Sequence, residues 1–181
     1  DTKTTVTAIV GKGSKANIEL MDVGDAQLGL VQSDVMAYAY NGTSLFENKI
    51  DGFSTVAALY MEQVQIVTLD PTIKSVADLK GKTVSVGESG SGVYFNAIDV
   101  LAAYDLTLDD INPTYQAFGD SVEALQDGKI DAAFVVAGAP TTAVTSLATT
   151  KQVYLVSLDQ EHIDALIAES PYYSPNTIKA N

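Results

Sequence analysis

The sequence contains no cysteine and no arginine, and it has a single histidine, His162. Without cysteine there are no disulfides, thiol nucleophiles or thiolate metal ligands. Without arginine, an anion can be held only by lysine, hydroxyl groups, amides or backbone N–H groups, because no guanidinium is present to form a bidentate pair. One histidine leaves little room for a histidine metal site or a catalytic triad.

Basic charge and long apolar runs are also scarce. The 181 residues include 10 basic and 23 acidic side chains, which gives a formal net charge of −13. This balance excludes the basic surface of a nucleic-acid-binding protein, so we expect no nucleic acid partner. No apolar run reaches the roughly 18 residues of a membrane-spanning helix. No signal peptide is visible, and a chain that starts at Asp1 without methionine is expected to be processed or trimmed.

What the chain does have is enough apolar sequence for a packed core, since 46% of its residues are hydrophobic and only 18% are charged. Its hydrophobic periodicity predicts alternating strands and helices. Strands are expected at 4–10, 28–31, 53–60, 63–69, 83–87, 113–118, 130–136 and 153–158. Helices are expected at 17–24, 33–40 and 75–81, from Gly92 onward, and at 121–127, 141–148 and 160–168. This order predicts an α/β fold with largely parallel sheets, and Asp70-Pro71 is its best internal boundary.

One internal similarity suggests two lobes of related topology. Residues 24–31 align without a gap on residues 128–135, and in each a helix ends at glycine before a buried strand runs into a small or polar tip. The alternative is that strand–helix units share this pattern in general.

The candidate ligand sites follow from this order. Ligands of open α/β sheets lie outside the carboxyl ends of the strands, where helix N-termini present free N–H groups. Residues 31–34, 87–92 and 136–141 meet that description. In the Gly/Ser loop at 87–92, small residues let a ligand approach the backbone, and the following helix dipole favours a carboxylate or phosphate. The loop lacks the spacing of a P-loop or a dinucleotide fingerprint, and the alternative is a plain strand-to-helix turn.

Other candidates carry less chemistry. His162 lies in an acidic helix and is expected to be solvated, while Tyr38 is expected to pack in the core. Tyr60 is better placed, at the end of a strand beside the expected hinge, and residues 172–173 either line a cleft or pin a crossover. Asp109-Asp110 has the pattern of helix-start charges. Because no nucleophile has a convincing base, we expect a protein that is not an enzyme.

Four stretches of the chain, in order, are similar to one family. The first is Leu-Gly-Leu-Val-Gln-Ser-Asp at 28–34, followed by Ala-Tyr-Ala-Tyr-Asn-Gly at 37–42. The second is Ser-Val-Ala-Asp-Leu-Lys-Gly-Lys-Thr-Val-Ser-Val-Gly at 75–87, followed by Gly-Ser-Gly at 90–92. The third is Asp-Gly-Lys-Ile-Asp-Ala-Ala-Phe-Val-Val-Ala-Gly-Ala-Pro at 127–140, and the fourth is Pro-Tyr-Tyr-Ser-Pro at 171–175. Together they resemble the TAXI subfamily of solute-binding proteins, which serve TRAP (tripartite ATP-independent periplasmic) transporters. Residues 75–87 are shared broadly among type II periplasmic binding proteins, whereas 32–34 and 134–140 are more diagnostic.

The resemblance implies a two-lobe type II periplasmic-binding-protein-like fold, with parallel or mixed sheets flanked by helices. Residues 72–155 would form a whole second lobe, and residues 1–71 with 156–181 an incomplete first lobe. Members of the family normally begin with a further strand and a Gly-rich, Tyr-containing loop, and they continue past the region of Asn181. The chain therefore resembles the middle of such a protein.

The resemblance also implies a function. The two lobes would close on a small carboxylate, such as glutamate or a dicarboxylate, and deliver it to a membrane TRAP permease. The protein would be a monomer outside the cytoplasm, in the periplasm or anchored at the outer face of the membrane, and would need no cofactor or metal. The residues expected around the ligand are Gln32, Ser33 and Tyr60 from the first lobe, and Ser89, Gly90, Ser91, Gly92, Gly138 and Thr141 from the second.

Two other functions on the same fold remain open at this point. The first is a ligand-sensing module of a regulatory protein, which a fused DNA-binding or signalling domain would indicate. The second, less favoured, is a transferase, which would need a nucleophile or a cofactor lysine in the cleft. Lys74, Lys80 and Lys82 cluster near a short helix and are expected to be solvated.

Overall fold

The computed structural model describes residues 3–179, and it is built around one five-stranded sheet with the order β3-β2-β4-β1-β5. The strands are β1 (Gln63–Thr68), β2 (Thr83–Ser85), β3 (Asn112–Thr114), β4 (Ala132–Ala137) and β5 (Tyr154–Leu155). β2 runs parallel to β3 and β4, whereas β1 runs antiparallel to β4 and β5. The sheet is therefore mixed, and the α/β class expected from the sequence is confirmed.

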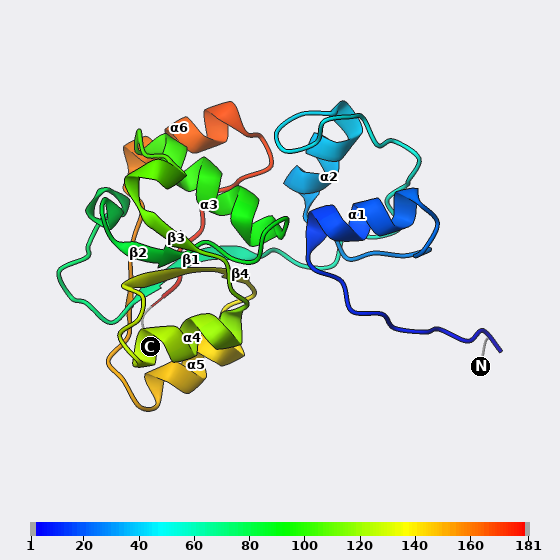
Figure 1. Ribbon diagram of the computed structural model, residues 1–181. Coiled ribbons are helices and arrows are strands. Elements are labelled where there is room, and N and C mark those ends of the chain that lie inside the picture. Colours follow the sequence, from blue (N-terminus) through cyan, green and yellow to red (C-terminus); the bar gives the residue numbers. More distant parts are fainter. Residues whose placement is uncertain (1–2, 180–181) are drawn as a thin grey trace.

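Helices cover both faces of this sheet (Figure 1). α3 (Gly92–Ala103) and α6 (Gln160–Glu169) lie on one face, and α4 (Phe118–Gln126) and α5 (Thr142–Ala148) on the other. Side chains alternate between the two faces along β1, as the period of a strand requires. Ile66 enters the core under α3 and α6, and Val67 enters the core under α4 and α5. Short 3-10 turns, η1 (Val76–Leu79) and η2 (Leu108–Asp110), connect the elements, and each begins with a capping box.

A second, smaller unit stands beside the N-terminal end of α3 (Figure 1). It consists of α1 (Ser14–Asp22) and α2 (Ser33–Asn41) with the loops around them. Its core is formed by Ile18, Val35, Ala39 and Phe46, and it is closed by Phe95, which comes from α3. The small unit therefore has no complete core of its own and depends on the helix of the larger one.

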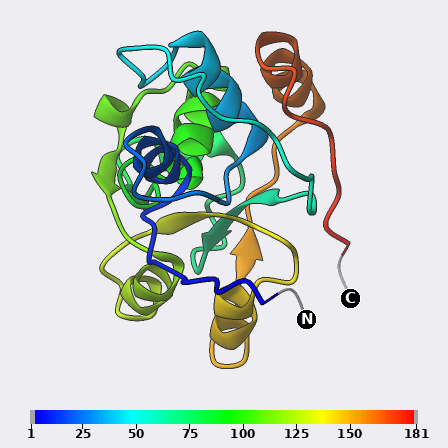
Figure 2. The ribbon, with the colours of Figure 1, turned by 90° about the vertical axis from the view of Figure 1, so that its right-hand side faces the viewer.

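The expectation of strands at 4–10, 28–31 and 53–60 is wrong in this structure, because all three segments are coil (Figure 2). Their apolar side chains face solvent, with Val10 95%, Leu30 73% and Val56 82% exposed. A strand is stabilised by hydrogen bonds to a neighbouring strand, and these segments have none beside them among residues 3–179.

The internal similarity between 24–31 and 128–135 is accordingly only half reproduced. Both segments begin at a glycine with positive φ, Gly24 at 84° and Gly128 at 68°, which follows a helix. Residues 132–137 then form the buried strand β4, whereas residues 28–31 are not a strand. No helix among residues 3–179 has the length and apolar character needed to cross a membrane.

Candidate functional site

The N-termini of α1, α2 and α3 converge on one point. A β-carbon on Gly13, the N-cap of α1, would lie 2.5 Å from the Cα of Ser91, the N-cap of α3. The backbone N–H of Gln32, the N-cap of α2, donates to Ser14 Oγ at 3.1 Å, and the Lys15 N–H donates to the Gly90 carbonyl at 3.1 Å. Because each helix N-terminus carries partial positive charge, this point favours an anion.

The first residues of α3, from Ser91 to Val93, are buried where the three helices meet. Ser91 Oγ accepts a hydrogen bond from the Tyr94 N–H at 3.2 Å. The N–H groups of Gly92 and Val93 precede the first intrahelical bonds, and among residues 3–179 no hydrogen bond satisfies them. A β-carbon on Gly92 would fall 1.2 Å from Gln32 Oε1, so any larger residue there would have to displace the end of that flexible side chain.

A buried polar network lies directly behind this point and joins α2, α3 and the segment that follows α6. Its centre is Asn96, which is 1% exposed. Asn96 Oδ1 accepts from Gln32 Nε2 at 2.7 Å, and its Nδ2 donates to Asp34 Oδ2 at 2.8 Å and to the Tyr173 hydroxyl at 2.5 Å. Asp99 Oδ2 in turn accepts from Tyr173 at 2.9 Å and from Tyr38 at 3.2 Å. The network ties together residues that are 61–77 positions apart in the chain.

The electrostatics of this network are dominated by buried acids without a basic partner. Burial raises the pKa of Asp34, against hydrogen bonds from the Val35 backbone and Asn96. Burial likewise raises the pKa of Asp99, against hydrogen bonds from Tyr173 and Tyr38, and it raises the pKa of Tyr38 to about 12. The network therefore holds its protons tightly and supplies no positive charge, so any attraction for an anion comes from the helix N-termini.

The structure brings Gln32, Ser91 and Gly92 together, and their clustering is a property of the fold that the sequence only suggested. Gly90 borders them through its carbonyl, which Lys15 occupies. Ser33 and Ser89 are exposed beside them. The Ser91 hydroxyl accepts from its own helix, so only its proton is left for a ligand.

No hydrogen bond among residues 3–179 joins Gly138, Thr141 or Tyr60 to Gln32, Ser91 or Gly92. Gly138 and Thr141 follow β4 at the sheet edge where β2 also ends, and a hydrogen bond links this loop to β1. Gln65 Nε2 donates to Thr141 Oγ1 at 2.9 Å, and that hydroxyl donates to the Gly138 carbonyl at 2.9 Å. Tyr60 is 68% exposed, and burial raises the pKa of the neighbouring Glu62 carboxyl, against a hydrogen bond from Tyr60 that lowers it in part.

Sequence reasoning missed Gly13 and Ser14 at the start of α1. The signal was present, because Gly-Lys-Gly-Ser at 11–14 precedes a helix as Gly-Ser-Gly does at 90–92. It also missed Asn96 and Asp99, whose spacing of three residues places them on one face of α3. Tyr173 fits both interpretations given for residues 172–173, because it pins the chain to α3 and also lines a cavity.

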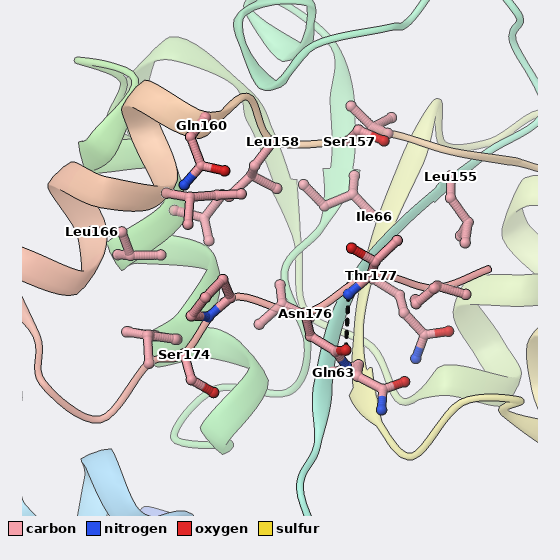
Figure 3. A pocket seen from close by; sticks show the side chains of 18 of the residues that line it. Gln63, Ile66, Leu155, Ser157, Leu158, Gln160, Leu166, Ser174, Asn176 and Thr177 are labelled. Carbon is pink, nitrogen blue, oxygen red and sulfur yellow. Dashed lines mark hydrogen bonds between the residues drawn. The ribbon is translucent and has the colours of Figure 1, made fainter.

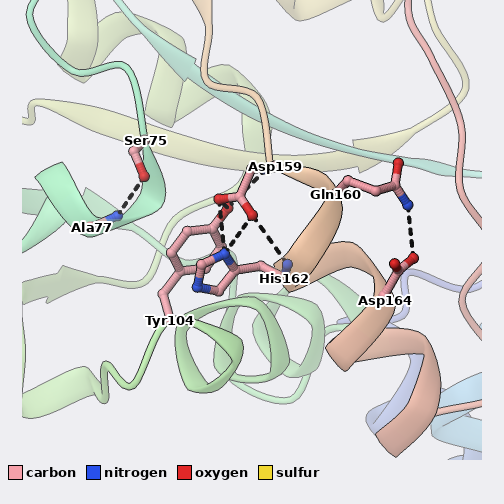
Figure 4. Close-up of polar contacts among 7 residues, drawn as sticks. All are labelled: Ser75, Ala77, Tyr104, Asp159, Gln160, His162 and Asp164. Carbon is pink, nitrogen blue, oxygen red and sulfur yellow. Dashed lines mark hydrogen bonds and ion pairs between the residues drawn. The ribbon is translucent and has the colours of Figure 1, made fainter.

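The expectation that His162 is solvated is corrected, because its side chain packs against Tyr104 and Asp159 (Figure 4). Its ring stacks on Tyr104 with centroids 3.7 Å apart, and its Nδ1 lies 2.7 Å from Asp159 Oδ1. Asp159 is the N-cap of α6 and accepts from the His162 N–H at 3.2 Å. The cluster therefore fixes the start of α6, where the chain leaves the sheet.

A separate cavity of about 410 Å³ lies between the start of β1, the β5–α6 connection and residues 173–178 (Figure 3). None of the described residues that line it is charged. Gln63, whose Oε1 accepts from the Ala139 N–H at 3.1 Å, stands at its edge, and the extended segment after α6 forms one wall. Tyr173 is the residue that the cavity shares with the buried network.

Comparison with solved structures shows the fold. The periplasmic aliphatic sulphonate binding protein SsuA from Escherichia coli matches with a TM-score of 0.52 at 24% identity, over 77% of this chain and 45% of its own. The alkanesulfonate-binding protein SsuA from Xanthomonas axonopodis pv. citri, bound to MOPS, matches with a TM-score of 0.53 at 23% identity, over 81% of this chain and 47% of its own. The chain thus shares the fold of periplasmic binding proteins and spans less than half the length of these two.

Comparison with protein families matches the chain to the NMT1-like family over residues 1–181.

Proposed function

Since the chain belongs to the NMT1-like family, we propose that it is part of a non-enzymatic solute-binding protein that captures a small anion where the N-termini of α1, α2 and α3 meet. The observation that carries this proposal is the pair of N–H groups at Gly92 and Val93, which have no hydrogen-bond partner among residues 3–179 and lie at the start of the longest of the three helices. A helix N-terminus stabilises a negatively charged group through these N–H groups and through its dipole.

The ligand class we propose is a carboxylate, such as glutamate or a dicarboxylate. A carboxylate presents two acceptor oxygens, which match two adjacent N–H groups, and the absence of arginine leaves backbone amides and hydroxyl groups as the main donors. Ser89, Gly90, Ser91 and Gly92 would surround it from one side, with Gln32, Ser33 and Tyr60 from the other and Gly138 and Thr141 at the neighbouring edge. The two solved relatives bind sulfonates by their names, so a sulfonate is the anion to compare with it.

The proposed working unit is a pair of lobes. Residues 72–155 would form one lobe, and residues 1–71 with 156–181 would form part of the other. Closure would add contacts to the ligand that the open form lacks, so ligand binding would shift the population toward the closed form. The delivery partner we propose is a membrane permease of the TRAP type, outside the cytoplasm, because residues 28–42 and 127–140 resemble the TAXI subfamily.

The test is thermal unfolding of the protein against glutamate, glutamine, 2-oxoglutarate, succinate and an alkanesulfonate. A ligand at 100 times its Kd stabilises the folded state by about 2.7 kcal/mol, and we expect the midpoint to rise by several degrees for a carboxylate.

The variant Ser91→Asp keeps an N-cap oxygen for the Tyr94 N–H but places a negative charge at the proposed site, so it should abolish the rise. Ser146→Asp, on the exposed side of α5, is the matched control and should retain it. A full response from Ser91→Asp, or no response of the unmodified protein to any anion, contradicts the proposal.

A further inference from the structure

We propose that the uncharged cavity beside β1 is a second binding site, which takes a neutral molecule with an apolar body and an amide group. The cavity measures about 410 Å³ and lies between β1, the β5–α6 connection and residues 173–178 (Figure 3). This volume falls within the range of small-molecule sites in proteins. The proposal goes beyond the proposed function and does not depend on it, because both the ligand class and the groups that bind it are different.

The ladder between β1 and the chain after β5 opens at this cavity. The Val156 N–H donates to the Ile66 carbonyl at 2.9 Å, so the backbone polar groups of Ile66 face β5. These groups alternate in direction along an antiparallel strand, so those of Val64, which lines the cavity, face the same way. The register places Leu158 opposite Val64, but among residues 3–179 no hydrogen bond joins their backbones. One N–H and one carbonyl of β1 are therefore left unpaired at the cavity.

The opposite wall of the cavity is also unpaired backbone. Residues 174–178 are extended and line the cavity. Within this stretch the hydrogen bond of a backbone N–H is from Thr177 to the side chain of its neighbour Asn176, at 2.8 Å. An amide carries a donor and an acceptor, so an amide in the cavity can pair with Val64 as a neighbouring strand would.

The apolar part of the ligand has a surface to bury against. Ile66 from β1, Val100 from α3 and Leu166 from α6 all line the cavity, and all three are buried members of the core on that face of the sheet. A branched aliphatic group placed against them would be removed from water, which is favourable.

The lining also excludes a charged ligand. The chain has 33 charged side chains, 10 basic and 23 acidic, yet none of the described residues that line the cavity is charged. Its polar side chains are amides and hydroxyl groups, such as those of Gln63, Ser157 and Asn176. A charge taken out of water without a partner costs much free energy, so a neutral molecule is the class that fits.

The first test uses N-acetyl-L-leucinamide, which combines a branched aliphatic side chain with two amides. In ¹H–¹⁵N NMR of the free protein, the Val64 N–H should exchange with water faster than the N–H of Gln65, which faces β4. Added N-acetyl-L-leucinamide should slow the exchange of Val64 and shift its resonance, with a Kd on the order of 1 mM for so small a molecule. N-acetyl-L-glutamate, which is charged, should leave Val64 unchanged.

Two results of this experiment would overturn the proposal. One is slow exchange of Val64 in the free protein, because its N–H would then already be paired. The other is an unchanged Val64 resonance at about fifty times the expected Kd, where a single site is nearly saturated.

The second test locates the ligand. Ile163→Trp, on the α6 side of the cavity, should fill the space and abolish binding, whereas Ala165→Trp, exposed on the same helix and outside the cavity, should retain it. If Ile163→Trp does not fold, Ser174→Trp on the exposed opposite wall takes its place. Undiminished binding by a folded cavity-filling variant would contradict the site.

The third test concerns the pairing with Val64 and the source of the amide. N-acetyl-N-methyl-L-leucinamide lacks the N–H that would reach the Val64 carbonyl, so it should bind roughly three- to tenfold more weakly, the equivalent of one hydrogen bond. Equal affinity would contradict the pairing. The blocked peptide acetyl-Ala-Leu-Ala-amide offers the same chemistry as an extended chain. Tighter binding of the peptide would identify a polypeptide strand as the source, and weaker binding would identify a small molecule.

Discussion

Phe95 joins the small helical unit to the rest of the molecule. It is buried, and its ring stacks on Tyr38 with centroids 5.8 Å apart and on Phe46 with centroids 6.2 Å apart. Asn96, the next residue, carries two of the polar contacts between the same two units. One turn of α3 thus supplies both the apolar and the polar attachment, which is why the candidate site lies where the two units meet.

Asp159 makes the start of α6 sensitive to acid. Hydrogen bonds from the His162 side chain and backbone lower the pKa of Asp159 to about 2. Because its pKa in the folded state is below the value in the unfolded chain, its stabilising effect is full above about pH 4. It is lost as the pH falls from there toward 2.

The variant Asp159→Asn should therefore have a lower unfolding midpoint at neutral pH and a flatter dependence of that midpoint on pH between 4 and 2. Thermal unfolding by circular dichroism across this range measures both. Asp105→Asn, an exposed residue with φ 55° that begins no helix, is the control. If Asp159→Asn keeps the same dependence of the unfolding midpoint on pH between 4 and 2, the Asp159 N-cap does not determine that dependence. The pKa values of Asp34 and Asp99 are raised by burial, so their contribution to the free energy of unfolding changes with pH in the direction opposite to that of Asp159.

At the scale of elements, α2 shows why the helices were easier to predict than the strands. Its hydrogen bonds are internal, its apolar residues follow the helical period, and Gly42 ends it in the left-handed region at φ 65°. Each of these signals lies within ten residues of sequence. The capping box at Ser75 and Asp78 is equally local, because its two side chains lie three positions apart in the sequence.

The strands required information that the local sequence does not hold. Residues 28–31 and residues 130–136 have the same apolar pattern, yet only the second pairs, because β1 and β2 lie on either side of it. The site has the same limit. Gly92 was found from its loop, whereas Asn96 reads as an ordinary helix residue until Gln32 and Asp34 are brought beside it by the fold.

Gly42→Ala should destabilise the small unit. An alanine in the left-handed region costs about 1–2 kcal/mol, and its β-carbon would lie 3.0 Å from the Lys49 N. Chemical denaturation measures the loss in free energy of unfolding. Gly52→Ala, in the loop that follows, is the matched control, because it has nothing within 4 Å of its β-carbon and no positive φ. Equal effects of the two substitutions would show that the end of α2 is not under this constraint.

At the scale of the whole molecule, order is unevenly distributed. The sheet and its four covering helices have two continuous apolar cores, whereas the small unit has one small core that is completed by Phe95 from α3. The apolar segments at 4–10, 28–31 and 53–60 all belong to the side of the molecule that carries the small unit (Figure 2). A net charge of −13 opposes self-association, which is consistent with the expectation of a monomer.

Amide hydrogen exchange should therefore divide the chain into two classes. Residues 4–10, 28–31 and 53–60 should exchange at nearly the rate of an unfolded chain, because their N–H groups are not in a ladder and their side chains are exposed. The centres of β1 and β4, which pair from Gln63 with Ala137 to Thr68 with Ala132, should be the slowest. Mass spectrometry of peptides from both regions measures the difference.

Dilution distinguishes the two ways in which this expectation can fail. Protection of the three segments that disappears on dilution would mean that a second copy supplies the neighbouring strand, since unpaired apolar edges promote such pairing. Protection that is independent of concentration would mean that the segments pair with each other within one chain, and that the local pattern at 4–10, 28–31 and 53–60 had predicted their structure correctly. Rapid exchange at every concentration would show that an apolar alternating sequence stays unpaired when nothing lies beside it.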